Sequence, residues 1–66
     1  MKYNLGDRFK IKNPDAPFRT TLRYELIKYV EDADKPYILA CDDCPGRPYA
    51  NTERQIDTHL MRIEGE

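Results

Sequence analysis

The stretch TTLRYELIKYVED, residues 20–32, decides the fold because its apolar side chains change faces partway along. Tyr24 and Leu26 alternate with polar residues, as on one side of a β-strand, whereas Ile27 and Tyr29 have the opposite parity. A bulge near the middle of a long strand, beginning at Leu26, produces this change because one extra residue turns the following side chains over. Such a strand can face two layers of a curled sheet. We therefore expect a β-barrel.

The preceding segment predicts another strand. In LGDRFKIK, residues 5–12, apolar Leu5, Phe9 and Ile11 alternate with basic residues, as in a half-buried strand that is entered through a turn at Gly6. Two prolines then predict a surface loop that ends near residue 20, and we expect Phe18 to cover the barrel as a lid.

Two further strands follow the long one. YILAC, residues 37–41, is a short apolar strand, and residues 47–51 form a fourth strand. Between them, Cys44-Pro45-Gly46-Arg47 suits a type I or type II turn with proline at its second position. This part of the chain therefore predicts a hairpin.

The last segment, TERQIDTHLMRIEGE, changes from strand to helix periodicity. Thr52 and Gln55 have the spacing of a capping box, and Ile56, Leu60 and Ile63 follow at helical intervals. A helix therefore begins at Thr52. Its end is open, because HLMRIE is equally suited to a short closing strand after one helical turn.

Strands joined by a long first loop, with a short helical turn before the end, resemble the SH3-like small barrels. The sequence thus predicts an all-β fold in which residues 1–66 form a single SH3-like domain. We expect a small SH3-like barrel of four or five antiparallel strands with a short C-terminal helical element.

The segments NLGDRFKI, YELIKYVED, YILAC and TERQIDTHLMRIE also resemble, in the same order, small SH3-like barrel proteins carried by phages and mobile elements. The resemblance covers nearly the whole chain but rests on core and turn positions, so it implies a fold and transfers no functional residue. Proteins of this kind are often accessory factors that bind a host or phage protein. The resemblance therefore implies a phage or mobile-element accessory factor that modulates its partner by stoichiometric binding.

Length and composition weigh against several functions. A 66-residue domain hides about 60% of the surface of its unfolded chain, which leaves little volume for a catalytic cleft. The chain has one histidine, two cysteines and three glycines, too few to suggest a catalytic arrangement or a phosphate loop, so we expect no enzyme. Neither a signal peptide nor an apolar run of about 18 residues is evident, which predicts a cytoplasmic protein that does not enter membranes.

The two cysteines raise the question of zinc, because Cys41 and Cys44 have the C-x-x-C spacing of a zinc knuckle. A complete site would need His59, the single histidine, and a carboxylate, or a second copy of the chain. Redox chemistry is disfavoured by the carboxylates of Asp42 and Asp43, which oppose thiolate formation. We favour an ordinary hairpin in which Cys41 is buried at the end of a strand, with no cofactor and zinc kept as the alternative.

Tyrosines are the best candidates for a protein interface, since they combine a large contact area with a polar tip. Tyr24 and Tyr37 should point inward, and the other three should lie on the surface. We therefore expect a protein partner, bound by the chain as a monomer or homodimer, at the aromatic residues and neighbouring arginines Tyr3, Tyr29, Arg47, Tyr49 and Arg54.

A basic strand face supports the alternative, nucleic-acid binding. Small barrels can bind nucleic acid through a cationic groove with aromatic platforms. The net charge of −1 and the interspersed acidic residues weaken this reading. The residues that would form the face are Arg8, Lys10 and Lys12 on the first strand, with Arg23 and Lys28 from the second.

Overall fold

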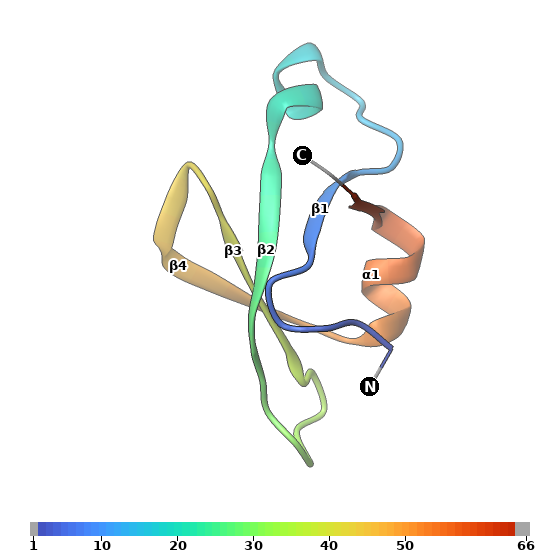
Figure 1. Ribbon diagram of the computed structural model, residues 1–66. Coiled ribbons are helices and arrows are strands. Elements are labelled where there is room, and N and C mark those ends of the chain that lie inside the picture. The colour runs from blue at the N-terminus through green and yellow to red at the C-terminus, as the bar shows by residue number, and fades with distance from the viewer. Residues whose placement is uncertain (1, 65–66) are drawn as a thin grey trace.

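Antiparallel strands dominate the computed structural model, which describes residues 2–64 (Figure 1). A short 3-10 helix follows the first strand, and an α-helix precedes the last. In chain order the elements are β1 (Arg8–Ile11), the 3-10 helix η1 (Pro17–Thr21), β2 (Arg23–Tyr29), β3 (Tyr37–Cys41), β4 (Cys44–Asn51), α1 (Glu53–His59) and β5 (Leu60–Ile63).

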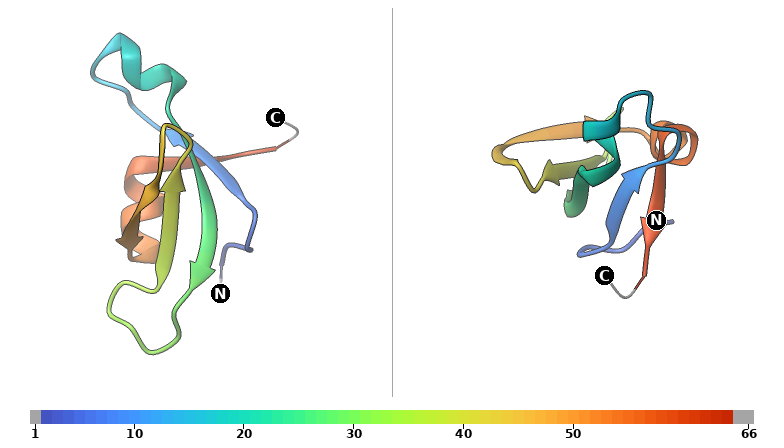
Figure 2. Two further views of the ribbon diagram at one scale, coloured as in Figure 1. Left: turned by 90° about the vertical axis from the view of Figure 1, so that its left-hand side faces the viewer. Right: turned by 90° about the horizontal axis from the view of Figure 1, so that it is seen from above.

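The five strands found within residues 2–64 form one antiparallel sheet in the order β4-β3-β2-β1-β5. Neighbours in sequence pair from β1 through β4, and β5 returns to the free side of β1. Figure 2 shows that the sheet is strongly curved and that α1 connects the strands at its two edges, β4 and β5. The predicted all-β fold, with antiparallel strands and a short C-terminal helix, is confirmed.

The predicted bulge in β2 is also confirmed. Leu26 lies opposite Leu39, but the next paired residue is Lys28, opposite Ile38, so the register shifts between Leu26 and Lys28. Leu26 is completely buried, whereas the bulged residue Ile27 is 45% exposed. Because of this extra residue, the side chains that face inward have even numbers up to Leu26 and odd numbers after Lys28.

A small apolar core sits inside the curve of the sheet. Each central strand contributes to it, and Ile56 brings in α1, so the helix is held against the sheet by a fully buried side chain. Partly buried aromatic residues surround this core, as expected in a chain without tryptophan. The buried cluster comprises Phe9, Leu26, Tyr37, Leu39 and Ile56, and the side chains packed on it include Tyr3, Tyr24, Tyr29 and Leu60.

Two predicted inward side chains are in fact exposed. Leu5 is 59% exposed because β1 begins only at Arg8, after a turn in which Gly6 adopts a φ of +92°. Phe18 is 65% exposed and does not cover the barrel; its ring instead faces the Arg19 guanidinium at 5.7 Å. Both residues lie in segments outside the ladder, where strand alternation does not determine side-chain direction.

The hairpin turn between β3 and β4 lies earlier than predicted. Cys41 pairs with Cys44, so the turn consists of Asp42 and Asp43, and β4 begins at Cys44 rather than Arg47. Between this pair and the Leu39–Tyr49 pair, β3 advances two residues and β4 five, so β4 bulges out. The segment contains Pro45 and Pro48, which cannot donate to the ladder, and this explains why the sequence suggested a turn there.

The C-terminal segment contains both of the elements that its sequence suggested. Thr52 caps α1 through the predicted capping box: the Gln55 amide donates to the Thr52 hydroxyl (3.0 Å) and the Thr52 amide donates to the Gln55 side chain (2.9 Å). The helix ends at His59, and the chain continues directly as β5. None of the helices within residues 2–64 has the length and apolar character needed to cross a membrane.

The bulge makes a prediction about neighbouring residues in β2. Leu26→Ala should lower the free energy of unfolding by about 2–5 kcal/mol, because it opens a cavity in a small core. Ile27→Ala, one residue away, should cost less than about 1 kcal/mol because Ile27 faces solvent. Urea unfolding followed by circular dichroism measures both values, and equal losses would contradict the bulge.

Candidate functional site

A concavity lies at the seam where the two edges of the sheet approach α1. Within residues 2–64, β4 pairs only with β3 and β5 pairs only with β1, so their outer edges are not joined to each other. A pocket of about 230 Å³ opens here, which we call the seam pocket. Its lining residues are Tyr24, Leu39, Tyr49, Asn51, Gln55, His59 and Leu60.

The apolar part of the seam pocket comes from the sheet and the start of β5. Leu39 is buried to 1% exposure and lies directly opposite Tyr49, which is 50% exposed. The rings of Tyr24 and Tyr49 meet edge to face, with centroids 6.5 Å apart. Burial raises the pKa of Tyr24. The pocket therefore offers two aromatic surfaces beside a buried aliphatic residue.

Polar side chains complete the seam pocket on the side of β4 and α1. The Asn51 side-chain amide donates to the backbone oxygen of Tyr49 (3.2 Å), and Gln55 is held by the capping box with Thr52. His59 follows one helical turn after Gln55, and no residue in 2–64 hydrogen-bonds to its imidazole. These groups can donate to or accept from a bound molecule while the apolar residues provide contact area.

A separate cluster fastens the N-terminal segment to α1. The Asp57 carboxylate accepts from the Tyr3 hydroxyl and from the Lys2 ammonium (2.9 Å). The Lys2 backbone amide donates to the Tyr37 hydroxyl (3.0 Å), and the Tyr3 ring packs edge-on against Phe9 with centroids 5.2 Å apart. Tyr3 is thus a core-covering residue as well as a hydrogen-bond donor.

These contacts shift the ionisation of the groups that make them. Burial, reinforced by the hydrogen bond to Asp57, raises the pKa of Tyr3 to about 12. The hydrogen bonds from Tyr3 and Lys2 lower the pKa of Asp57. Because the neutral phenol is favoured in the folded state, the stability contributed by Tyr3 is present below the ordinary tyrosine pKa of 10.0 and is lost as the pH rises toward 12.

Tyr3→Phe should remove this dependence on alkaline pH. We expect the free energy of unfolding of the wild type to fall more steeply than that of the variant above about pH 10. Urea unfolding between about pH 8 and 11 checks the difference, and tyrosinate absorbance gives the titration of the phenol. Parallel stability curves, or a Tyr3 midpoint near the ordinary tyrosine value, would contradict the contact with Asp57.

The residues predicted to bind a protein partner fall into two groups. Tyr49 is exposed in the seam pocket, and Arg47 and Arg54 are exposed on β4 and α1, the elements that border it. Tyr3 and Tyr29 differ from the expectation of a free surface position, because both are half-buried and pack on the core. The centroid of the Tyr29 ring lies 5.0 Å from that of Tyr37, because the β2 bulge turns the Tyr29 side chain toward the core.

The residues of the predicted basic face do not form one continuous surface, because some of them are ion-paired and others are far apart along β2. Arg8 binds the carboxylates of Glu25 (3.2 Å) and Asp42, and the Lys12 ammonium donates to the Asp57 backbone oxygen (2.9 Å). The two carboxylates offset the charge of Arg8, which a phosphate backbone would otherwise attract.

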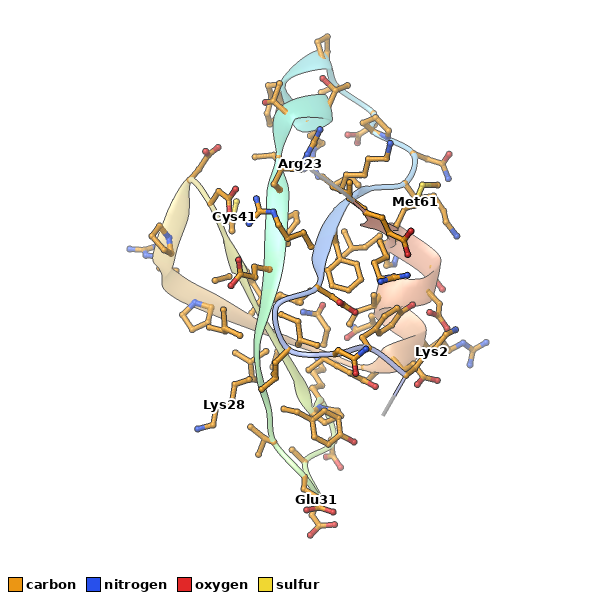
Figure 3. All side chains as sticks on the ribbon, in the orientation of Figure 1. Lys2, Arg23, Lys28, Glu31, Cys41 and Met61 are labelled. Atoms are coloured by element: carbon orange, nitrogen blue, oxygen red, sulfur yellow. The ribbon has the colours of Figure 1, made fainter. Side chains whose placement is uncertain are left out.

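The remaining members of the predicted basic face are also separated from one another. Arg23 lies directly opposite Lys10 and donates to the backbone oxygens of Thr20 (2.8 Å) and Leu22 (3.0 Å). Lys28 lies beyond the bulge, and Figure 3 shows it far from Arg23 along β2. Only Lys10 and Arg23 of this set are thus brought directly side by side across the ladder.

The residues of the alternative intramolecular zinc site are not brought together within residues 2–64. Cys41 and Cys44 do adjoin each other, but no three cysteine, histidine, aspartate or glutamate side chains within residues 2–64 come together in a way that could hold a metal ion. His59 lies in the seam pocket, whereas the cysteines lie at the β3–β4 turn. Residues 41–44 do form a hairpin with Cys41 buried at the end of β3, as predicted, but Cys44 begins β4 rather than lying in the turn.

Sequence reasoning identified Tyr49 and placed His59 in a different role, but it missed the seam pocket as a unit. Tyr24, Leu39 and Leu60 were expected to be apolar strand or helix residues, and Gln55 was expected only as a helix cap. Nothing in their spacing connects them, because they come from four elements of the sheet and helix. The strand order would have been needed to find the pocket.

Comparison with known proteins gives one similarity. The chain is 28% identical over 65 residues to a protein of Arabidopsis thaliana described as "Probable ubiquitin-conjugating enzyme E2 23". The match covers 98% of this chain but 6% of the plant protein, so it concerns a small segment of that protein. No family model matches the chain, and no solved structure matches it.

Proposed function

We propose that this protein is a small, non-enzymatic binding module whose seam pocket receives one side chain of an extended segment of a protein partner. The observation that carries the proposal is the seam pocket itself, with two tyrosines and a buried leucine beside a polar rim. In this proposal the protein works in the cytoplasm as an accessory factor of a phage or mobile element, the role that the sequence resemblance implies.

The size of the seam pocket favours a side chain over a small-molecule cofactor. Pockets for drug-sized ligands and cofactors usually measure about 300–1,000 Å³. The seam pocket measures about 230 Å³, below that range, and is suited to a single apolar or aromatic side chain. Tyrosine-lined pockets are effective for this purpose, because the rings provide contact area and lose little conformational entropy.

The strand edges beside the pocket suit the backbone of an extended segment. β5 pairs with β1 on one side, and its Leu60 lines the seam pocket. An unpaired strand edge presents amide and carbonyl groups that can bind another strand. The edge of β4 suits this less well, because Pro45 and Pro48 lack donors. We therefore propose that the partner segment runs along β5.

Two arginines on elements that form the pocket suit a steering role. Arg47 on β4 and Arg54 on α1 are exposed, and the same two elements contribute Tyr49 and Gln55 to the seam pocket. Exposed charges at the rim of an interface affect the association rate and specificity more than the affinity. The aromatic residues are therefore proposed as the anchor, and the two arginines as contacts that orient the partner.

The chemistry of the lining residues supports binding more than catalysis. The described residues that line the seam pocket include neither a serine or cysteine nucleophile nor a carboxylate. His59 therefore has no neighbour in the lining that could complete a hydrolytic arrangement. The similarity to a segment of a plant protein named as a probable ubiquitin-conjugating enzyme adds no activity to this proposal, given its 6% coverage of that protein.

Peptide selection followed by mutation tests the proposal. Peptides selected from a displayed random library against the purified chain should perturb the NMR signals of the seam-pocket residues. Tyr49→Ala should weaken such a peptide by about 30-fold, the effect of a typical interface hot spot of about 2 kcal/mol. Because Tyr49 is half exposed, the variant should stay folded, which circular dichroism checks.

Lys10→Glu provides the matched control, because Lys10 lies on β1, outside the seam-pocket lining, and should leave peptide affinity unchanged. Peptides that bind with equal affinity to the wild type and to Tyr49→Ala would overturn the proposal. So would binding of an oligonucleotide that weakens steeply with salt and is lost in Lys10→Glu, since this is the behaviour of the alternative function.

A further inference from the structure

Cys41 and Cys44 are placed together by the register of the β3–β4 hairpin. Cys41 ends β3, Cys44 begins β4, and the two lie directly opposite each other across the turn formed by Asp42 and Asp43. Opposed residues of an antiparallel pair have their side chains on one face and their Cα atoms about 4.5–5.5 Å apart. Disulfides span Cα separations of about 4.4–6.8 Å, so the hairpin holds this pair within bonding range.

The two thiols differ in accessibility. Both are free, and Cys44 is exposed whereas Cys41 is only 6% exposed. Figure 3 shows Cys41 near the end of the hairpin. An external disulfide therefore reaches Cys44 first, while Cys41 is positioned to attack Cys44 from within the fold.

Arg8 changes the charge balance at the turn. Considered in sequence, the two carboxylates between the cysteines oppose thiolate formation. In the structure the Arg8 guanidinium binds the Asp42 carboxylate, and the Asp42 backbone amide donates to the Arg23 oxygen (2.9 Å). One of the two carboxylates beside the cysteines is thus paired with a cation and held in place at the turn.

We propose that Cys41 and Cys44 form a reversible modification site for low-molecular-weight disulfides such as oxidised glutathione. The Cys44 thiolate attacks one sulfur of oxidised glutathione, so a protein–glutathione disulfide forms and one glutathione thiolate leaves. The Cys41 thiolate then attacks the Cys44 sulfur, forms the Cys41–Cys44 disulfide and releases the second glutathione thiolate. The protein loses two electrons and two protons, which reduce one oxidised glutathione to two glutathione molecules.

The modification should restrain β4 where its pairing is interrupted. Directly after Cys44 the strand leaves the ladder, and the next residue paired after the bulge is Tyr49. A covalent bond at Cys44 constrains one end of this bulge. The backbone amides of Cys44, Gly46, Arg47 and Tyr49 should therefore exchange with solvent more slowly in the oxidised chain than in the reduced chain.

Mass spectrometry of the full chain treated with oxidised glutathione tests the site. The wild type should pass through a transient adduct of one glutathionyl group, mapped to Cys44, and finish as a monomer lacking two hydrogens with no free thiol. Cys41→Ser should stop at a stable adduct on Cys44, because the resolving thiol is absent. Cys44→Ser should be modified far more slowly, because the remaining Cys41 is buried.

Several results would overturn the proposal. These are a wild-type chain that keeps a stable Cys44 adduct beside a free Cys41, a first adduct on Cys41, or disulfide-linked dimers as the main product. If Cys41→Ser is unstable, the order in which the Cys44 adduct and the internal disulfide appear in the wild type tests the proposal instead. Since none of these measurements uses a library-selected peptide that binds the seam pocket, the site can fail or succeed independently of that pocket.

Discussion

The buried contact between Leu26 and Leu39 is the constraint on which the rest of the structure depends. A chain of 66 residues has few side chains with which to build a core. Both halves of the central strand β2, before and after the bulge, must therefore contribute side chains to it. The bulge after Leu26 makes this possible, because it moves Ile27 outward and returns Tyr29 to the core beside Tyr37. Without it, alternation would direct Tyr29 away from the core.

The same curvature explains why the candidate site lies at the seam. The sheet bends far enough for its edges to approach α1, and Ile56 holds the helix against the core between them. Side chains from the sheet and from the helix then surround a space that no single element could form. The residues that face this space, such as Tyr49 and His59, are therefore far apart in sequence but neighbours in the fold.

Charge in this protein is used locally. Arg8 binds the Glu25 carboxylate on β2 and the Asp42 carboxylate in the β3–β4 turn, and Asp57 fastens Lys2 and Tyr3 to α1. The net charge is −1, and the paired basic residues do not gather into a broad positive surface. This arrangement agrees better with recognition by contact in a small pocket than with attraction to a polyanion.

The amino-acid sequence by itself determined the features that depend on neighbouring residues: the change of parity in residues 20–32, the capping box at Thr52 and the strand-forming segments. These are short-range effects, in which backbone preference and side-chain alternation act within a few residues. Only the tertiary structure decided that Leu5 and Phe18 are exposed, that Tyr3 covers the core, and that Cys41 faces Cys44 across the hairpin. The seam pocket also belongs to this second group, because a space between strand edges exists only once strand order and curvature bring distant side chains together.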